Sequence, residues 1–491
     1  MPDAARPRPW LVLAICCMSL LMVSLDVTIL NVALPAVRSD LHTSVSGLQW
    51  TVDAYTLVLA SLLMLSGSTA DRIGRRRVFR IGLVVFGAAS LLCSLAPGLG
   101  WLIVARMLQA VGGSMLNPVA MSIISNTFTD SRQRARAIGV WGGVVGISMA
   151  AGPILGGALV ESAGWRAIFW INVPIALAAF VLTGRYVPES RAARARRVDP
   201  VGQTLVVVLL AGITYAIIES PQRGWSSPVV LGCTAAALAA LLGLLRYEPR
   251  RTDPLIDLRF FRSAPFAGAT VIAVAAFAGL GGFLFVSSLY LQDIRGLEPL
   301  HAGLYMLPMA VMALVTGPLS GRMVAARGPR TPLLLAGAAL SASAVIQAVS
   351  YSEHLSTGLL VLAFLLFGIG FGLVNAPITN TAVSGMPRAQ AGVAAAVAST
   401  SRQVGQSLGV AVIGALMAGA AHSDPAAFTG TARTAWWIIA GCGAVVLVAG
   451  TLTSGRWARA TAERTAARLA AEEAGEEAGE ESRTAKEKVD A

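Results

Sequence analysis

The sequence predicts an all-α integral membrane protein with fourteen transmembrane helices. The chain of 491 residues is 55% hydrophobic but only 13% charged, and its mean hydropathy is +0.68. Soluble domains carry about 25% charged residues, so the charges here are too few to cover a water-exposed surface. Long apolar runs recur along the chain and are separated by short loops that carry arginine. Lipid must therefore cover much of the outside.

The apolar runs place the helices. A hydrocarbon core about 30 Å thick needs roughly 20 helical residues per crossing. Runs of that length predict spans near residues 10–36, 48–70, 78–96, 101–126, 136–160, 167–186, 200–219, 227–247, 265–292, 300–324, 331–351, 356–379, 391–420 and 433–456. The first run is full length and no small-residue cleavage site follows it, so we expect it to remain as the first helix.

The arginines alternate between the two sides of this map. Alternate loops carry bursts near residues 6–8, 72–80, 132–136, 185–197, 246–262 and 322–330, with a further arginine at position 388. The loops between them carry only Arg38, Arg166, Arg223, Arg295 and Arg433. Positive residues concentrate on the cytoplasmic side of membrane proteins. The pattern predicts a multi-pass protein of the cell membrane with both termini in the cytoplasm.

A weak internal repeat suggests two related halves. The loop at 67–76 is echoed at 317–330, where Gly-Pro and arginines recur. Repeated halves around a central cavity are a common transporter plan. We expect a six-helix bundle over 1–190, two inserted helices with their flanking loops over 191–262, and a second six-helix bundle over 263–457. Residues 458–491 are rich in Ala, Glu and Arg and predict a charged cytoplasmic tail, part helical and part disordered.

Several other functions are disfavoured. An ATP-driven pump needs the phosphate-binding motif GxxxxGK[ST], and no lysine precedes Lys486. The four histidines lie in or beside loops, and the five cysteines show neither metal-ligand spacing nor a disulfide framework. The net charge of +12 is spread in bursts without interleaved aromatic residues, which argues against nucleic-acid binding. We expect no enzyme activity, no metal and no cofactor.

Three ionisable residues fall within the predicted first bundle at similar depth: Asp26, Asp53 and Arg106. Insertion of such groups costs roughly 2.5–3.5 kcal/mol each, so each needs a partner or a function. Two carboxyl groups beside one arginine are suited to holding and releasing a proton, because burial and like charge favour the protonated form of one carboxyl. The alternatives are a static salt-bridge cluster, or an interfacial position for Asp53.

Further polar residues within the spans are candidates for a substrate cavity. Arg402 and Gln403 lie in the middle of the thirteenth span, where polar side chains should face the bundle interior. The complete candidate set is Asn31, Gln109, Asn117, Asn375, Arg402 and Gln403. Hydrogen bonding between helices is an alternative for each asparagine, and it is the default interpretation.

Charges just inside the membrane suggest a conformational gate. The candidates are Asp71, Arg72, Arg75 and Arg76, which follow the second span. They could hold the two halves together in one conformation. Ordinary cytoplasmic orientation by positive charge is the simpler interpretation, and it contributes in either case.

The fifth span is rich in glycine and contains a Gly-Pro pair. The candidate hinge consists of Gly152, Pro153, Gly156 and Gly157. A proline inside a helix leaves a carbonyl unpaired and bends the helix, as a moving half would require. Small residues three or four apart also allow helices to pack closely, so close packing remains an equal alternative.

Six segments in order resemble the fourteen-helix drug:proton antiporter branch (EmrB/QacA type) of the major facilitator superfamily. They are residues 25–35, 67–76, 106–112, 151–157, 165–174 and 401–405. The resemblance implies that Asp71 and Arg75 occupy gating positions, that Arg106 belongs to a proton-transfer motif, and that 151–157 is a motif of exporters. Ala110 replaces a usual glycine, and Gly321 stands where the first half has Asp71, which weakens the case for a second gate.

The expected function is export of a hydrophobic, cationic or zwitterionic small molecule in exchange for protons, by alternating access. Asp26 and Asp53 would alternate between the proton and the substrate charge, and Arg106 would tune them. The alternatives are an exporter of one dedicated metabolite such as a self-made antibiotic, a facilitator or importer, and a receptor built on the same fold. The expected partners are the substrate, protons and membrane lipid. A monomer is sufficient.

Overall fold

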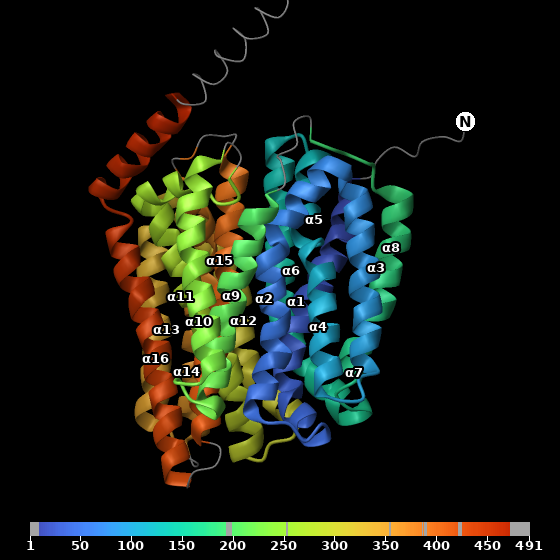
Figure 1. Cartoon of the computed structure of the whole chain (residues 1–491), viewed down its shortest axis with the longest axis vertical. Coiled ribbons are helices and arrows are strands. Elements are labelled where there is room, and N and C mark those ends of the chain that lie inside the picture. The colour runs from blue at the N-terminus through green and yellow to red at the C-terminus, as the bar shows by residue number, and fades with distance from the viewer. Residues whose placement is uncertain are drawn as a thin grey trace, which may run out of the picture.

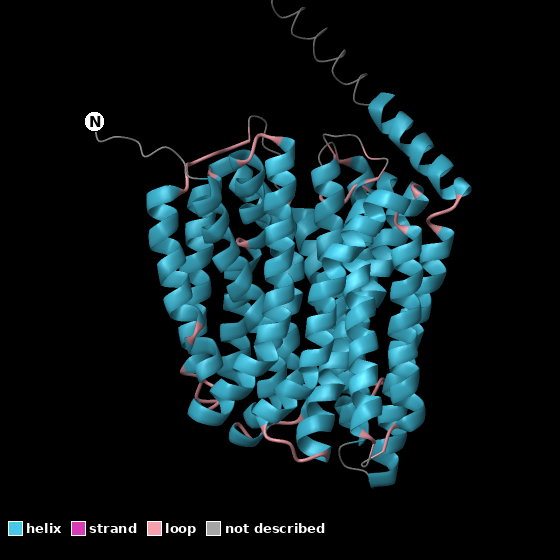
Figure 2. Ribbon diagram, turned by 180° about the vertical axis from the view of Figure 1, so that it is seen from behind, coloured by secondary structure: helices cyan, strands magenta, loops and turns pink. Residues whose placement is uncertain are grey.

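The computed structural model is helical throughout the residues it describes, which are 9–192, 199–251, 254–352, 355–384, 386, 390–420 and 425–471. The long helices run roughly parallel to one another, and connecting loops lie at both ends (Figures 1 and 2). Several predicted loop arginines (6, 8, 194, 196, 197 and 388) and the tail beyond 471 lie outside the described residues.

The helices follow the predicted order. The first group is α1 (Pro9–Asp40), α2 (Val45–Ile73), α3 (Arg75–Ser94), α4 (Leu99–Ser114), α5 (Asn117–Thr127), α6 (Ser131–Ala163), α7 (Ala167–Trp170) and α8 (Asn172–Tyr186). Then come α9 (Pro200–Arg223), α10 (Pro228–Tyr247) and the short 3₁₀ turns η1 (Glu248–Arg250) and η2 (Leu258–Arg262). The last group is α11 (Ala264–Leu289), a π-helical turn η3 (Tyr290–Ile294), α12 (Pro299–Arg327), α13 (Arg330–Ser350), α14 (Thr357–Val383), α15 (Ala391–Ala420) and α16 (Pro425–Leu452).

Each predicted span coincides with one helix or one pair of helices. Thirteen helical stretches of the described chain are long and apolar enough to cross a membrane. The remaining long helix, α15, occupies the position of the thirteenth predicted span and has 30 residues. It is not among the thirteen, and it carries Ser401, Arg402, Gln403 and Gln406 in one stretch. The all-helical membrane architecture is confirmed.

Two predicted spans are interrupted. The span at 101–126 divides into α4 and α5, and the span at 167–186 divides into α7 and α8. Pro118 and Pro174 stand near the first turns of α5 and α8, where proline lacks the N–H that a continuous helix would use. Prolines fit the first turn of a helix, so the chain restarts there instead of continuing.

The helices pack as two groups. α1 packs against α6 and α8, and α3 packs against α4 and α8. On the other side α11 packs against α14, α15 and α16, and α13 packs against α14 and α16. In Figure 1 the blue and teal helices lie on one side and the yellow to red helices on the other. The contacts between the groups are chiefly those of α6 with α12 and of α2 with α15.

The seam between α6 and α12 is closed at one end and open at the other. A Cβ on Gly157 would lie 2.5 Å from Leu300 Cα, and one on Gly303 would lie 2.2 Å from the Pro153 carbonyl oxygen. The same helix faces lack neighbours toward the end that carries the α2–α3 loop. The glycines whose added Cβ would meet nothing within 4 Å include Gly139, Gly142 and Gly143 on α6 and Gly317 and Gly321 on α12. The two helices therefore diverge toward that end.

The helix α9 lies against both groups, because it packs on α2 and on α15. Its hydrogen bonds go to α2. Trp50 Nε1 donates to Glu219 at 2.9 Å at one end of the pair, and Gln203 Nε2 donates to the Ser61 carbonyl at 2.5 Å toward the other. This helix, the first of the two predicted to be inserted between the bundles, is thus held along α2 by hydrogen bonds.

The predicted tail begins as a packed helix over residues 456–471. Ala458, Ala462, Thr465 and Leu469 recur at helical spacing and are buried. The Ala264 N–H donates to Thr461 Oγ1 at 3.0 Å, which ties this helix to the start of α11. The first part of the tail is therefore packed on the protein, not solvated on all sides as its composition suggested.

Candidate functional site

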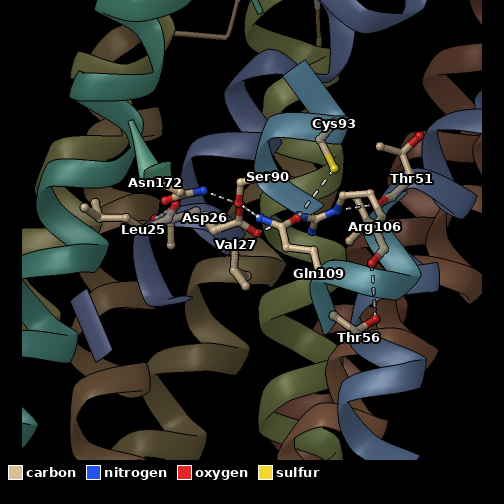
Figure 3. A network of polar contacts seen from close by, with 12 residues as sticks. Leu25, Asp26, Val27, Thr51, Thr56, Ser90, Cys93, Arg106, Gln109 and Asn172 are labelled. Carbon is tan, nitrogen blue, oxygen red and sulfur yellow. Dashed lines mark hydrogen bonds and ion pairs between the residues drawn. The ribbon is translucent and has the colours of Figure 1, made fainter. Parts of the chain in front are cut away.

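A buried ion pair joins α1 to α4. Arg106 Nη1 donates to Asp26 Oδ2 at 2.5 Å, and both side chains are 1% exposed (Figure 3). α1 and α4 bring these two side chains together from positions 80 residues apart. The prediction that these two charges lie close together in the first bundle is met by the structure.

Amide side chains complete the network. Gln109 Nε2 and Asn172 Nδ2 both donate to Asp26 Oδ1, at 2.8 and 3.0 Å. Arg106 also donates to Gln109 Oε1 at 2.6 Å and, through Nε, to the Thr51 carbonyl at 3.2 Å. Figure 3 shows these groups converging from α1, α2, α4 and α8. Buried charges are tolerated when paired and hydrogen-bonded, which is the case here.

The network is enclosed by the first group of helices. The Tyr55 ring lies 4.2 Å from the Arg106 guanidinium carbon, a cation–π contact. All the hydrogen bonds that the described residues make to Asp26 and Arg106 come from the first group. Gln109, predicted as a cavity residue, belongs to this network instead.

Asp53 does not join this network, which corrects the expectation of two carboxyl groups sharing one arginine. Residues two apart on a helix point in nearly opposite directions. Thr51 and Tyr55 face Arg106, so Asp53 between them faces away. Ser407 of α15 lies beside its carboxyl group. Asp53 is fully buried at the contact between the two groups of helices.

The surroundings of Asp53 contain no cation among the described residues. Thr56 Oγ1 donates to Asp53 Oδ1 at 3.3 Å. Neither Asp53 Oδ2 nor Ser407 Oγ has a hydrogen-bond partner of good geometry. An interfacial position is therefore wrong for Asp53, because the carboxyl group is sealed between helices.

Polar side chains near Asp53 and along α1 join the two groups of helices at the end where α6 and α12 are also in contact, and sequence reasoning missed them. We call this closed end of the contact between the two groups the outer seam. Gln49 Nε2 donates to the Ala411 carbonyl at 2.8 Å, joining α2 to α15. Ser288 Oγ donates to the Asn31 carbonyl at 2.5 Å, joining α11 to α1. Gln292 Nε2 donates to the Val32 carbonyl at 2.9 Å. One signal was available: Gln49 lies four residues before Asp53, on the same helix face.

Asn31 and Asn117 have local roles in the structure. Asn31 Nδ2 donates to the Val27 carbonyl at 2.8 Å within α1, and the side chain is 3% exposed. Asn117 begins α5 at the break after α4, and its buried amide oxygen has no hydrogen-bond partner. A substrate-cavity role for Asn31 and Asn117 stays a prediction.

The glycine motif of α6 packs on two neighbours. A Cβ on Gly152 would lie 2.0 Å from Thr28 Oγ1, and one on Gly156 would lie 3.1 Å from Ile29, both on α1. Gly157 and Pro153 face α12, as described above. α6 continues through Pro153 as one helix. Close packing on both sides is what the structure gives for this motif, and a hinge at Pro153 remains a prediction.

The predicted gate charges contact their own half. Arg75 Nη2 donates to Asp71 Oδ1 at 2.8 Å. Arg76 donates through Nη2 to the Gly184 carbonyl at 2.5 Å and through its backbone N–H to Glu189. Arg72 is exposed. Among the described residues the bonds of this loop end at residues 184–192, so the predicted gate residues make no hydrogen bond or ion pair to the second half in this conformation.

The chain turns sharply between α2 and α3, at the point where this loop meets Glu189. Gly74 has φ of +118°, and a Cβ there would lie 2.7 Å from the Glu189 carboxyl group. Only glycine adopts that conformation without strain, and only glycine leaves room for the carboxylate. The loop and the end of α8 are therefore fixed to each other.

In the second half, Arg402 and Asn375 lie on adjoining helices. Arg402 Nη2 donates to Thr379 Oγ1 at 2.5 Å, which joins α15 to α14. Asn375, four residues before Thr379, donates to the Phe371 carbonyl at 3.1 Å. Gln403 is half-buried. Arg402, Gln403 and Asn375 are partly buried and Thr379 is exposed, so these polar groups lie on an accessible surface of the second group and are not sealed between helices.

Two packed groups of long helices, with an ion pair buried at membrane depth, define a multi-pass membrane protein of the transporter kind. The chain belongs to the Major Facilitator Superfamily, whose sequence model matches residues 16–410.

Characterised relatives cover most of the chain. It is 38% identical over 418 residues to the tetracenomycin C resistance and export protein of Streptomyces glaucescens, covering 84% of this chain and 77% of that one. It is 37% identical to the multidrug resistance protein Stp of Mycobacterium tuberculosis, covering 82% and 74%. It is 36% identical to the methylenomycin A resistance protein of Streptomyces coelicolor, covering 81% and 83%.

Solved structures share the fold. The human organic anion transporter MFSD10 superposes with a TM-score of 0.63 at 14% identity, covering 91% of this chain and 100% of that one. A bacterial homologue of the lysosomal transporter Spinster superposes with the same score at 17% identity, covering 95% and 99%. These similarities bear on the fold alone.

Proposed function

We propose that this protein is a proton-coupled secondary exporter of hydrophobic small molecules, of the fourteen-helix antiporter branch, in the cell membrane with both termini in the cytoplasm. Relatives at 34–38% identity are named as drug efflux, resistance or export proteins. The proton gradient would drive transport without a cofactor, and one copy of the chain suffices. The open end of the α6–α12 seam would then face the cytoplasm.

The observation that carries the coupling proposal is Asp53. Its carboxyl group is buried between α2 and α15, and no cation among the described residues compensates it. A buried ionised carboxylate without a partner costs several kcal/mol, and a proton removes that cost. The closed outer seam is thus compatible with a protonated Asp53 and destabilised by an ionised one.

This difference gives a direction to the cycle. Loss of the proton to the cytoplasm, linked to substrate binding, would destabilise the closed seam and favour the outward-open state. Substrate would leave there, and the higher external proton concentration would protonate Asp53 again and close the seam. Asp26 and Arg106 would hold α1, α2, α4 and α8 together as one unit during this movement.

Purified protein in vesicles with an imposed pH gradient tests the proposal. Ethidium and pyrenebutyrate serve as a cationic and an anionic probe. We expect wild type to accumulate at least one of them, and a protonophore to abolish the accumulation. Asp53→Asn should lose gradient-driven accumulation, because the amide cannot exchange a proton. Ser407→Ala is the matched control at the same seam and should retain accumulation.

A second readout follows the seam directly. In a cysteine-free background, a cysteine at Ser288 should be labelled from outside faster as pH rises, because deprotonation favours seam opening. Asp53→Asn should remove that pH dependence and keep labelling slow. Full gradient-driven accumulation by Asp53→Asn would contradict the role of Asp53. Asp26→Asn with normal expression and full proton-dependent efflux would exclude a coupling role for Asp26.

A narrower function is export of one dedicated compound. Two relatives are named for resistance to a single antibiotic, tetracenomycin C or methylenomycin A. A protein of that kind should protect cells against one compound and leave sensitivity to a panel of unrelated drugs unchanged. Facilitated diffusion or import would show no outward accumulation against a gradient in the vesicle assay.

A further inference from the structure

Arg402 is a partly buried cation of the second half, and among the described residues it has no compensating charge. Its guanidinium lies between α11, α14 and α15, where Nη2 donates to Thr379 Oγ1 and Cζ lies 6.0 Å from the Phe277 ring centroid. Its Nε is buried and has no hydrogen-bond partner. Throughout the described ranges, no carboxylate lies within 4.0 Å of this guanidinium.

The helices around it, α11, α14 and α15, contain no acidic residue. Between Glu298 and Asp424 the only acidic residue is Glu353, whose position in the sequence falls between α13 and α14. Thr379 and Arg402 lie toward the C-terminal end of α14, whereas Glu353 precedes the start of this helix. Arg106 in the first half has Asp26 as its partner, so the two halves differ. A charge at membrane depth without a partner points to a function.

Asp53 does not supply the missing charge in this conformation. It lies beside Ser407, five residues further along α15 than Arg402. Five residues advance a helix by about 7.5 Å and turn it to a different face. The two groups therefore lie at different levels of the α15 surface.

The residues around Arg402 form a coherent binding surface. Phe371, Asn375 and Thr379 recur every fourth residue and share one face of α14. The Phe371 ring packs edge-on against Phe277, with centroids 5.2 Å apart. The guanidinium thus lies between the Thr379 hydroxyl and the Phe277 ring, and Asn375 lies one helical turn from Thr379 on the same face of α14. Pockets that bind small molecules combine apolar walls with a few convergent polar groups in this way.

We propose that Arg402 is an anion subsite, which binds a carboxylate, phenolate or phosphate group of a hydrophobic ligand while Phe277 and Phe371 contact its apolar body. A guanidinium presents several N–H donors in a planar fork that matches such oxyanions. The proposal deepens the proposed function and rests on it for the ligand's identity as a substrate. It replaces the expectation of a cationic substrate with one that carries a negative group.

Binding of pyrenebutyrate tests the proposal without requiring transport. Purified full-length protein in phosphatidylcholine nanodiscs is titrated with pyrenebutyrate, and energy transfer from tryptophan reports saturable binding. The methyl ester of the same compound is the uncharged matched probe. We expect wild type to bind the acid at least about tenfold more tightly than the ester, as a charge-assisted hydrogen bond provides.

Substitutions separate charge recognition from structure. Arg402→Gln should weaken acid binding at least about tenfold and leave ester binding unchanged, which also shows that the variant is folded. Arg402→Lys should bind the acid with an affinity between those of wild type and Arg402→Gln, because lysine keeps the charge but not the planar fork. If Arg402→Gln lost affinity equally for the acid and the ester, the role of Arg402 would be to join α14 to α15, and the proposal would be overturned. Acid binding by Arg402→Gln at wild-type strength, or no saturable acid binding by wild type, would overturn it as well.

Lipid composition distinguishes the source of the anion. If phosphatidylglycerol in the nanodiscs competes with pyrenebutyrate in wild type but not in Arg402→Gln, a lipid phosphate is the ligand and the anion subsite stands. Without such competition, the subsite serves a dissolved compound. Failure of gradient-driven accumulation in the vesicle assay, together with Arg402-dependent acid binding, would reject proton-coupled export and retain the subsite.

Discussion

Removing the negative charge of Asp26 should destabilise the protein far more than removing an exposed carboxylate. The Asp26 carboxylate accepts hydrogen bonds from Arg106, Gln109 and Asn172, and it is the only carboxylate within salt-bridge distance of Arg106 among the described residues. Asp26→Asn leaves a buried guanidinium without its counter-charge and turns one acceptor into a donor facing other donors. Breaking one side of a buried pair costs about 3–5 kcal/mol.

The assay is equilibrium unfolding in mixed detergent and SDS micelles, followed by tryptophan fluorescence and helical circular dichroism. Asp40→Asn is the matched control, because the Asp40–Arg166 pair joins the same kinds of group at 2.6 Å with both side chains 40% or more exposed. Exposed pairs contribute about 1 kcal/mol or less. We expect the loss of unfolding free energy from Asp26→Asn to exceed that from Asp40→Asn at least about threefold.

A double variant isolates the interaction. Asp26→Asn combined with Arg106→Gln removes both charges, so it should cost less than the sum of the two single substitutions. Coupled neighbours show interaction energies of about 0.5–3 kcal/mol, and this pair should lie at the upper end of that range. Additive losses, or a cost for Asp26→Asn no larger than for Asp40→Asn, would refute the view of this network as a buried lock.

Two further predictions concern packing. Gly303→Val should prevent the outer seam from closing, because even a Cβ would lie 2.2 Å from the Pro153 carbonyl oxygen, and labelling of a cysteine at Ser288 should therefore rise several-fold. Gly321→Val is the control, because its Cβ has open space around it, and it should leave labelling unchanged. Trp50→Phe removes the indole N–H that donates to Glu219, and it should lower the unfolding free energy by about 1 kcal/mol in the same SDS titration. Trp225→Phe is the control, because Trp225 is 66% exposed, and it should have no measurable effect.

The sequence was sufficient for the helices and insufficient for their mutual orientation. Apolar run length fixes where spans lie, because the bilayer imposes it. Breaks such as those near Pro118 and Pro174 are visible only as prolines, whose effect depends on position in the helix. Asp26 and Arg106 could be paired from depth alone. The same reasoning wrongly added Asp53, because depth does not specify which face of α2 a residue occupies.

The residues predicted as a gate and as a substrate cavity illustrate a second limit. Asp71 and Arg75 could be located from their charges, but not assigned to a contact, since partners of a moving element change with conformation. Arg402 could be found as a charge at depth. Its missing counter-ion emerges only when the neighbours of its guanidinium are known. Backbone carbonyl acceptors, such as that of Ala411 for Gln49, leave no trace in the sequence.

The attachment of α9 has a consequence for the moving parts of this transporter. Because Trp50, Ser61 and their partners bind α9 to α2, this helix should travel with the first half and slide over α15. It would act as a sliding cover on the membrane-facing side of the joint where Asp53 lies, keeping acyl chains out of a gap that opens and closes. A chain lacking α9 and α10 would expose that joint to lipid on each turnover.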